Sequence, residues 1–207
     1  MLSRAARSAA RRLAGQRDGV AIVEFALLIP VLLLLYFGTV EITNVLRHAR
    51  KLDILSRTIG DTLSQRTRPT SAEVEDIFRA AAIVLAPYAA DGVRITISAV
   101  GVPGVPGGTE PGPLRVCSSA AASGSPLRAP EAPAPVSDAE ATQPAGTRLI
   151  LVEITSTYRP VSGPGVFRDA VSGLDLVRKT LWPVRYGRRY ASESPEIVLP
   201  GGLPCPP

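Results

Sequence analysis

The sequence predicts an α+β protein in which a long membrane-spanning stem helix precedes a small domain with a mainly antiparallel sheet. Three observations lead to this fold class. Residues 20–40 carry a single charge, Glu24, and match the roughly 20 residues that a helix needs to cross a bilayer. Apolar residues then recur at helical spacing as far as Leu63. Two later segments, 92–100 and 148–158, alternate apolar and polar residues as strands do.

The excess positive charge of the chain lies at its N-terminus. Residues 1–19 hold five arginines and one acid, whereas residues 20–207 hold 18 basic and 17 acidic side chains. A nucleic-acid surface also needs aromatic side chains among its basic ones, and aromatics make up only 5% of the chain. We therefore expect a short basic leader, residues 1–19, and no nucleic-acid partner.

The apolar stretch at 20–40 has two other interpretations. A buried core helix would need a polar face for water, and the run LLIPVLLLLYF offers none. A secretory signal peptide would need a small-residue cleavage site after the apolar run, and the residues that follow, YFGTVEI, show no such pattern. A transmembrane helix over 20–40 is the better prediction. Arginines and lysines flank it almost equally, so charge does not fix its orientation.

The segment GVAIVEFALLIPVLLLL, after a basic leader, resembles the start of TadE/TadG-like pseudopilins of the tight-adherence (Flp) type IV pilus system. Pro30 also fits the family's EFALxxP pattern. The likeness is strong over residues 15–45 and general afterwards. It implies cleavage by a prepilin peptidase between Gly19 and Val20, on the cytoplasmic side of the bacterial inner membrane. It also implies that the domain after the helix is periplasmic or otherwise extracytoplasmic.

The resemblance gives Glu24 and Phe25 a role in subunit assembly, as the fifth and sixth residues of the mature chain. Glycine at position 19 admits a protease close to the backbone, because it has no side chain. Cleavage leaves an amine on Val20 that the Glu24 carboxylate of a neighbouring subunit can neutralise. The alternative is that Glu24 reaches the headgroups without a partner. The expected partners are the inner membrane, the prepilin peptidase, other pilin or pseudopilin subunits and the pilus assembly platform.

A stem helix is expected to continue the span over residues 41–65. Its apolar stripe either packs on the protein's own domain or forms a seam between subunits; it comprises Ile42, Val45, Leu46, Ala49, Leu52, Leu55, Ile59 and Leu63. A second helix should begin where Thr70 and Glu73 have the spacing of a capping box, and should end at Pro87.

The remaining chain, residues 66–207, forms the expected extracytoplasmic α+β domain. Its segment 101–147 contains nine prolines and seven glycines, and this composition predicts a long flexible insertion without a core. Residues 167–181 are expected to form a helix and residues 182–186 a short extended piece. Five cations in this region form a loose basic group, which is either solvated or in contact with headgroups or a partner: Arg178, Lys179, Arg185, Arg188 and Arg189.

The two cysteines, Cys117 and Cys205, lie on the side of the membrane where disulfides persist, if the orientation above holds. Their pairing would tie the C-terminal tail to the insertion, and two unpaired thiols are the alternative. His48 is the only histidine and is expected to be a solvated surface residue, since cations surround it in the sequence.

No grouping typical of catalysis occurs in the sequence, and we expect neither an enzyme nor a bound metal or cofactor. The sequence predicts a minor pseudopilin, an assembly protein of the tight-adherence system that acts by helix packing in the membrane. The alternative is an unprocessed, signal-anchored single-span protein whose external domain binds a ligand or the cell wall.

Overall fold

The computed structural model describes residues 18–88, 92–103, 110–160, 165, 169, 173–187 and 196–205. The leader before Asp18 lies outside these residues, and so do residues 167, 168 and 170–172 of the helix expected at 167–181. Packing divides the chain into two units, Met1–Asn44 with Pro160–Ala170, and Val45–Arg159 with Val171–Pro207.

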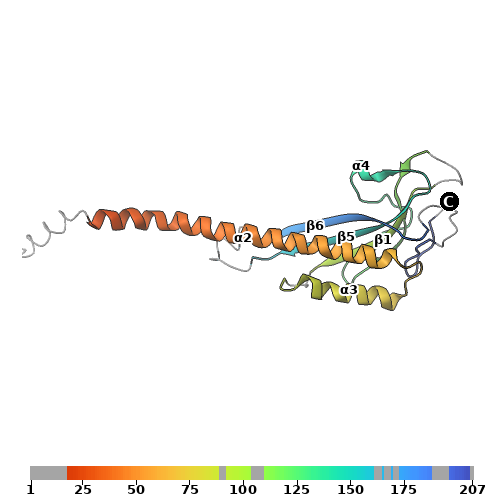
Figure 1. Cartoon of the computed structure of the whole chain (residues 1–207), viewed down its shortest axis with the longest axis horizontal. Coiled ribbons are helices and arrows are strands. Elements are labelled where there is room, and N and C mark those ends of the chain that lie inside the picture. Colours follow the sequence, from red (N-terminus) through yellow and green to blue (C-terminus); the bar gives the residue numbers. More distant parts are fainter. Residues whose placement is uncertain are drawn as a thin grey trace, which may run out of the picture. The chain divides into compact units, whose positions relative to one another are not determined.

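Helix α2 (Asp18–Ser64) contains both the predicted span and the predicted stem in 47 uninterrupted residues (Figure 1). Leucine and alanine favour the helix. Near its centre the hydroxyls of Thr39 and Thr43 donate to backbone carbonyls one turn earlier, at 2.7 and 2.8 Å. Pro30 lies inside the helix, where it removes one backbone donor. The prediction of one long N-terminal helix is confirmed.

Helix α3 (Ser71–Leu85) begins at the predicted capping box. The Glu73 amide donates to the Thr70 hydroxyl (3.3 Å), and the Thr70 amide donates to the Glu73 carboxylate (2.8 Å). These two bonds satisfy backbone donors that a helix start otherwise leaves free. The same backbone bond from Thr70 is the main reason that the pKa of Glu73 is lowered. The helix ends before Pro87, as predicted.

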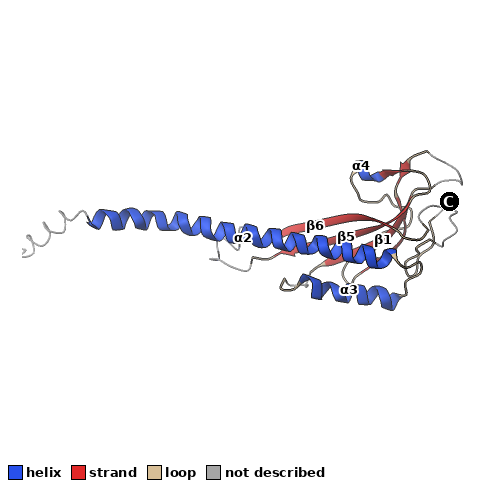
Figure 2. Ribbon diagram, viewed as in Figure 1, coloured by secondary structure: helices blue, strands red, loops and turns tan. Residues whose placement is uncertain are grey.

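The sheet of the second unit has four antiparallel strands in the order β3-β1-β5-β6 (Figure 2). Both strands expected from alternation are present, as β1 (Arg94–Gly101) and β5 (Arg148–Tyr158). The other two are β3 (Arg115–Ala121) and β6 (Leu174–Pro183). A two-stranded ladder of β2 (Gly112–Pro113) and β4 (Thr142–Gln143) and a short helix, α4 (Asp138–Ala141), lie between β1 and β5 in sequence. The α+β fold class is confirmed.

One face of the sheet packs on the second half of α2 and on α3. The alternating residues Ile95, Ile97 and Ala99 of β1, with Ile150 and Val152 of β5, form this core with the helices. The members from α2 are Leu52, Leu55, Ile59 and Leu63, all nearly inaccessible to solvent. The later part of the predicted stripe therefore packs on the protein's own domain, whereas Ile42 and Leu46 remain exposed.

The other face of the sheet is covered by the proline- and glycine-rich segment. Leu114, Val116 and Ala134 pack with Val100 of β1 and Leu151 of β5 in a second buried cluster. The expectation that 101–147 carries no core is wrong for its described residues. A few apolar side chains are enough here because the sheet supplies the opposite surface; residues 104–109 lie outside the described part.

The prediction of a helix at 167–181 is wrong for residues 174–181, because Leu174–Pro183 forms strand β6. Asp169, which the structure also describes, is helical. This strand pairs with β5 in an unbroken register from Tyr158↔Leu174 to Leu149↔Pro183. Ladder bonds to a strand already in place outweigh the local helical tendency of the segment. The extended piece expected at 182–186 begins with the end of this strand.

Candidate functional site

The start of α2 places the residues proposed for processing and assembly close together. The bond between Gly19 and Val20 lies in the first turn of the helix, and Glu24 follows Val20 by four residues, or one turn. Positions four apart lie on the same side of a helix, so Glu24 and Val20 lie on the same side of α2. The Glu24 and Phe25 side chains are exposed.

The surface around these residues is apolar. Every residue from Ala21 to Tyr36 is exposed, including Leu27 at 72% and Ile22 at 70%. Among the described residues, one helix is long and apolar enough to cross a membrane, namely α2 from Ala21 onward. Exposed apolar surface of this extent requires cover by lipid or by other helices. With a folded unit after it, this helix fits a single-pass membrane protein.

Cys117 of β3 and Cys205 near the C-terminus form a disulfide, with their Cα atoms 4.6 Å apart. Both residues are buried. Further contacts hold the same C-terminal segment: the Leu199 amide donates to the Ser118 hydroxyl (3.1 Å), and Glu196 pairs with the buried Arg148 (3.0 Å). The C-terminal segment is therefore part of the second unit's core.

His48 is buried, so the expectation of a solvated surface residue is wrong. Its Nε2 lies 3.1 Å from the Ser156 hydroxyl of β5, and its ring stacks on Tyr88 at 4.4 Å between centroids. The ring of Tyr158 also lies near the His48 ring, with 5.8 Å between the two centroids. Burial lowers the pKa of His48, because the charged imidazolium would lose its hydration. Arg47 and Arg50, which lie beside His48 in the sequence, are exposed, because side chains adjacent in sequence diverge around a helix.

The N-terminal segment is similar to a known protein family. Residues 19–59 match the TadE-like protein family. The match starts at Gly19, includes Glu24 and Phe25, and ends at Ile59, before the first strand of the sheet. It confirms the resemblance to TadE-like pseudopilins. TadE-like proteins are associated with the tight-adherence pilus as structural or assembly proteins, and the family is not one of enzymes. No curated protein and no solved structure matched the chain.

Helix α2 is joined to the sheet domain by ion pairs that the sequence did not indicate. Asp53 accepts from Arg178 of β6 (2.7 Å), and Asp61 accepts from Arg185 (2.7 Å). Two members of the predicted basic group therefore have acidic partners on α2. These pairs are partly solvated, so each contributes only a fraction of about 1 kcal/mol. Arg188 and Arg189 lie outside the described residues.

Close packing of α2 on β6 depends on Gly60. A Cβ atom at this position would lie 2.8 Å from Cγ of Trp182. Glycine thus lets the helix approach the indole, although it is a weak helix former. The sequence contains no signal for this contact, because a glycine within a helix has many possible reasons.

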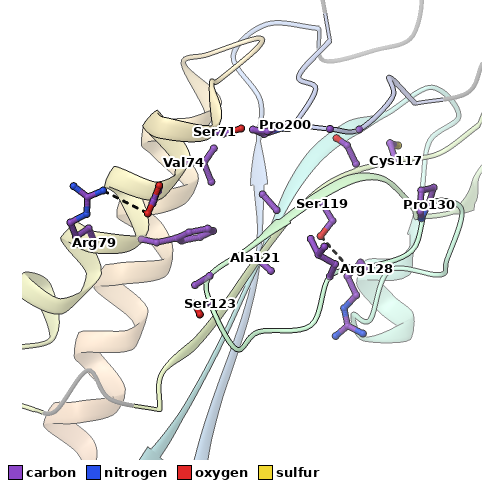
Figure 3. A pocket seen from close by; sticks show the side chains of 18 residues that line it. Ser71, Val74, Arg79, Cys117, Ser119, Ala121, Ser123, Arg128, Pro130 and Pro200 are labelled. Carbon is purple, nitrogen blue, oxygen red and sulfur yellow. Dashed lines mark hydrogen bonds and ion pairs between the residues drawn. The ribbon is translucent and has the colours of Figure 1, made fainter.

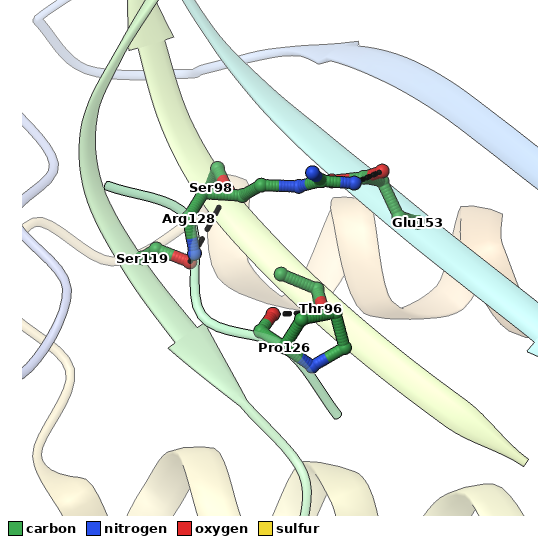
Figure 4. A network of polar contacts seen from close by, with 6 residues as sticks. All are labelled: Thr96, Ser98, Ser119, Pro126, Arg128 and Glu153. Carbon is green, nitrogen blue, oxygen red and sulfur yellow. Dashed lines mark hydrogen bonds and ion pairs between the residues drawn. The ribbon is translucent and has the colours of Figure 1, made fainter. Parts of the chain in front are cut away.

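A second polar network fixes the proline-rich segment to the sheet (Figure 4). Arg128 donates two hydrogen bonds to Glu153 of β5, at 2.9 and 2.6 Å, and its own amide donates to the Ser119 hydroxyl. The Thr96 hydroxyl donates to the Pro126 carbonyl (2.9 Å). Its hydrogen bonds to Glu153 raise the pKa of Arg128. The two hydrogen bonds from Arg128 explain how the charged Glu153 side chain can be buried on this second face of the sheet.

A groove of about 800 Å³ lies between α3 and the edge strand β3 (Figure 3). Its wall on α3 includes Val74 and Phe78, and its wall on β3 includes Ser119 and Ala121. Arg79, at the rim, pairs with Asp76 on its own helix (3.2 Å). The groove is mostly apolar and has no cluster of catalytic groups among its lining residues.

Proposed function

We propose that this chain is a minor pseudopilin of the tight-adherence pilus system, inserted in the bacterial inner membrane with its N-terminus in the cytoplasm. A prepilin peptidase cuts it between Gly19 and Val20. The mature subunit then assembles by packing of α2 against the helices of other pilins or of the assembly platform. The observation that carries the proposal is the TadE-like match from residue 19 onward on one continuous helix, whose exposed residues 21–36 are apolar except for Glu24.

Glu24 is the residue to which we assign pairing between subunits. Its carboxylate is the only charge between Val20 and Val40, and such a charge in a membrane helix is costly unless it has a partner. Cleavage creates a partner of opposite charge, the amine of Val20. Neutralisation of both charges within one contact would favour side-by-side packing of subunits with this register.

Processing is tested by N-terminal sequencing of the chain extracted from membranes that contain the peptidase. A mature chain that starts at Val20 is expected, and Gly19→Leu should accumulate the precursor, because a bulky side chain obstructs the approach of the protease. An intact leader on the wild-type chain would refute processing. That outcome would favour the signal-anchored alternative, in which the groove between α3 and β3 binds a ligand or the cell wall.

Assembly is tested with a series at position 24. Glu24→Gln removes the charge with little change of shape, and Glu24→Asp keeps the charge with a shorter reach. We expect normal insertion and cleavage of both variants, loss of cross-linked complexes with other pilins for Glu24→Gln, and an intermediate level for Glu24→Asp. Ile22→Leu, at an exposed position of the same helix, is the control that should behave as wild type. Normal pili with Glu24→Gln would show that the glutamate is only tolerated.

A further inference from the structure

The first turns of α2 in the second unit carry cations without acidic partners. Arg47 and Arg50 are exposed, and neither has an ion pair within the part of the chain that the structure describes. Both follow Val40, the end of the apolar stretch, by ten residues or fewer. Cations so close to a membrane span favour retention on the cytoplasmic side, so their place after the span acts against the proposed orientation. The two arginines therefore need an explanation other than membrane orientation.

These two arginines line an open hollow of about 320 Å³ together with Lys51, Ile54, Pro87 and Tyr88. The Lys51 ammonium is held against the end of α3, where it donates to the carbonyls of Val84 (3.1 Å) and Ala86 (2.9 Å). An ammonium has three N–H donors, so one is left for a ligand. The hollow therefore combines three positive charges with donors suited to a phosphate group.

The remaining wall of the hollow is apolar. Ile54 is 54% exposed, and Pro87 is exposed beside it. Leu46, in the turn before Arg50, is 56% exposed. A free phosphate ion makes no favourable contact with an apolar surface. A phospholipid does, because its phosphate is joined to glycerol and acyl chains. Leucine and isoleucine beside arginines are typical of helix segments at the membrane interface.

We propose that this hollow, formed by Arg47, Arg50, Lys51, Ile54, Pro87 and Tyr88, binds the phosphate of an anionic phospholipid. The lipid belongs to the leaflet on the C-terminal side of the span, because α2 carries these residues directly out of the apolar stretch. Binding there would fix the depth and rotation of α2 in the bilayer. The inference rests on α2 as a membrane helix and is independent of cleavage at Gly19 and of pilus assembly.

The experiment titrates fluorescent phosphatidylglycerol into micelles of a neutral detergent that contain the full chain. Arg47→Gln and Arg50→Gln should each raise the dissociation constant about fivefold, the effect expected of one cation near an anionic lipid. Arg57→Gln is the matched control, since Arg57 is an exposed cation of the same helix that does not line the hollow. It should bind as wild type. The leader arginines give the same background in every variant.

Three outcomes would overturn the proposal. They are an equal loss with Arg57→Gln, equal binding of fluorescent phosphatidylcholine, and displacement of the lipid by inorganic phosphate. An equal loss with Arg57→Gln would show a non-specific effect of charge. Equal binding of phosphatidylcholine would show that the headgroup charge does not matter, and displacement by phosphate would show that the hollow binds a free anion. Thermal unfolding followed by Trp182 fluorescence, unchanged in all three variants, shows that the domain remains folded. N-terminal sequencing of the same samples reports on processing separately.

Discussion

Replacement of both Cys117 and Cys205 by alanine should lower the free energy of unfolding of the sheet domain by about 4.6 kcal/mol in the chain-entropy model. The disulfide closes a loop with a sequence separation of 88 residues. In that model the cross-link stabilises by restricting the unfolded chain, and the effect grows with the logarithm of loop length. A loop of this length is near the upper end of the usual range.

The folded state should survive the change because the disulfide is not the only attachment of the C-terminal segment. Ile197 and Leu199 belong to the helix-facing core, and Arg148 pairs with Glu196. We therefore expect the variant to fold with the same sheet and to lose stability mainly through a freer unfolded chain. Contacts retained in the unfolded state would make the measured loss smaller than the model value.

The assay is urea unfolding of the full chain in neutral detergent, followed by the fluorescence of Trp182, the only tryptophan. For a slope of about 2 kcal/mol per molar urea, the midpoint should fall by about 2 M. Thiol labelling of the denatured, unreduced wild type should find no free thiol. Two free thiols per chain, or a midpoint that neither alanine substitution nor a reductant changes, would refute this reasoning.

Three further predictions concern the second unit. Gly60→Ala should destabilise it by about 1–3 kcal/mol, because the new methyl group would displace Trp182; Gly38→Ala, with open space around it, should not. Stability should fall as the pH drops below the usual pKa of histidine, about 6.5, because the unfolded chain then binds a proton that buried His48 resists. His48→Phe should remove this part of the pH dependence in urea titrations at several pH values. Thr70→Ala should cost about 1 kcal/mol in the same titrations through loss of the α3 cap, and an unchanged midpoint would contradict that role.

The elements that could be predicted from the sequence are those with local causes. A stretch of 21 residues with one charge determines a helix that can cross a membrane, since backbone groups in lipid must bond within the segment. The Thr70 and Glu73 pair sets the start of α3 through bonds three residues apart. Strand β5 follows from alternation, because successive side chains of a strand point to opposite faces. The family resemblance likewise depends on a short contiguous segment.

The features that could not be predicted depend on residues far apart in the sequence. Residues 174–183 became a strand because β5 offers a complete row of backbone partners, and no local property of the segment reveals that row. His48 is buried because β5 and Tyr88 pack around it, although its neighbours in sequence are cations. The need for glycine at position 60 likewise appears only when Trp182 is in place.

By itself the sequence determined the membrane helix, the helix cap, two central strands and the TadE-like character of residues 19–59, all of which are encoded within short segments. Only the tertiary structure decided which face of α2 is buried, that the proline-rich segment covers the sheet, and where isolated charges find partners. Arg128 and Glu153, for example, are 25 residues apart and are joined across the second face of the sheet. Burial and ion pairing depend on distances in space, and those distances exist only after the strands have paired.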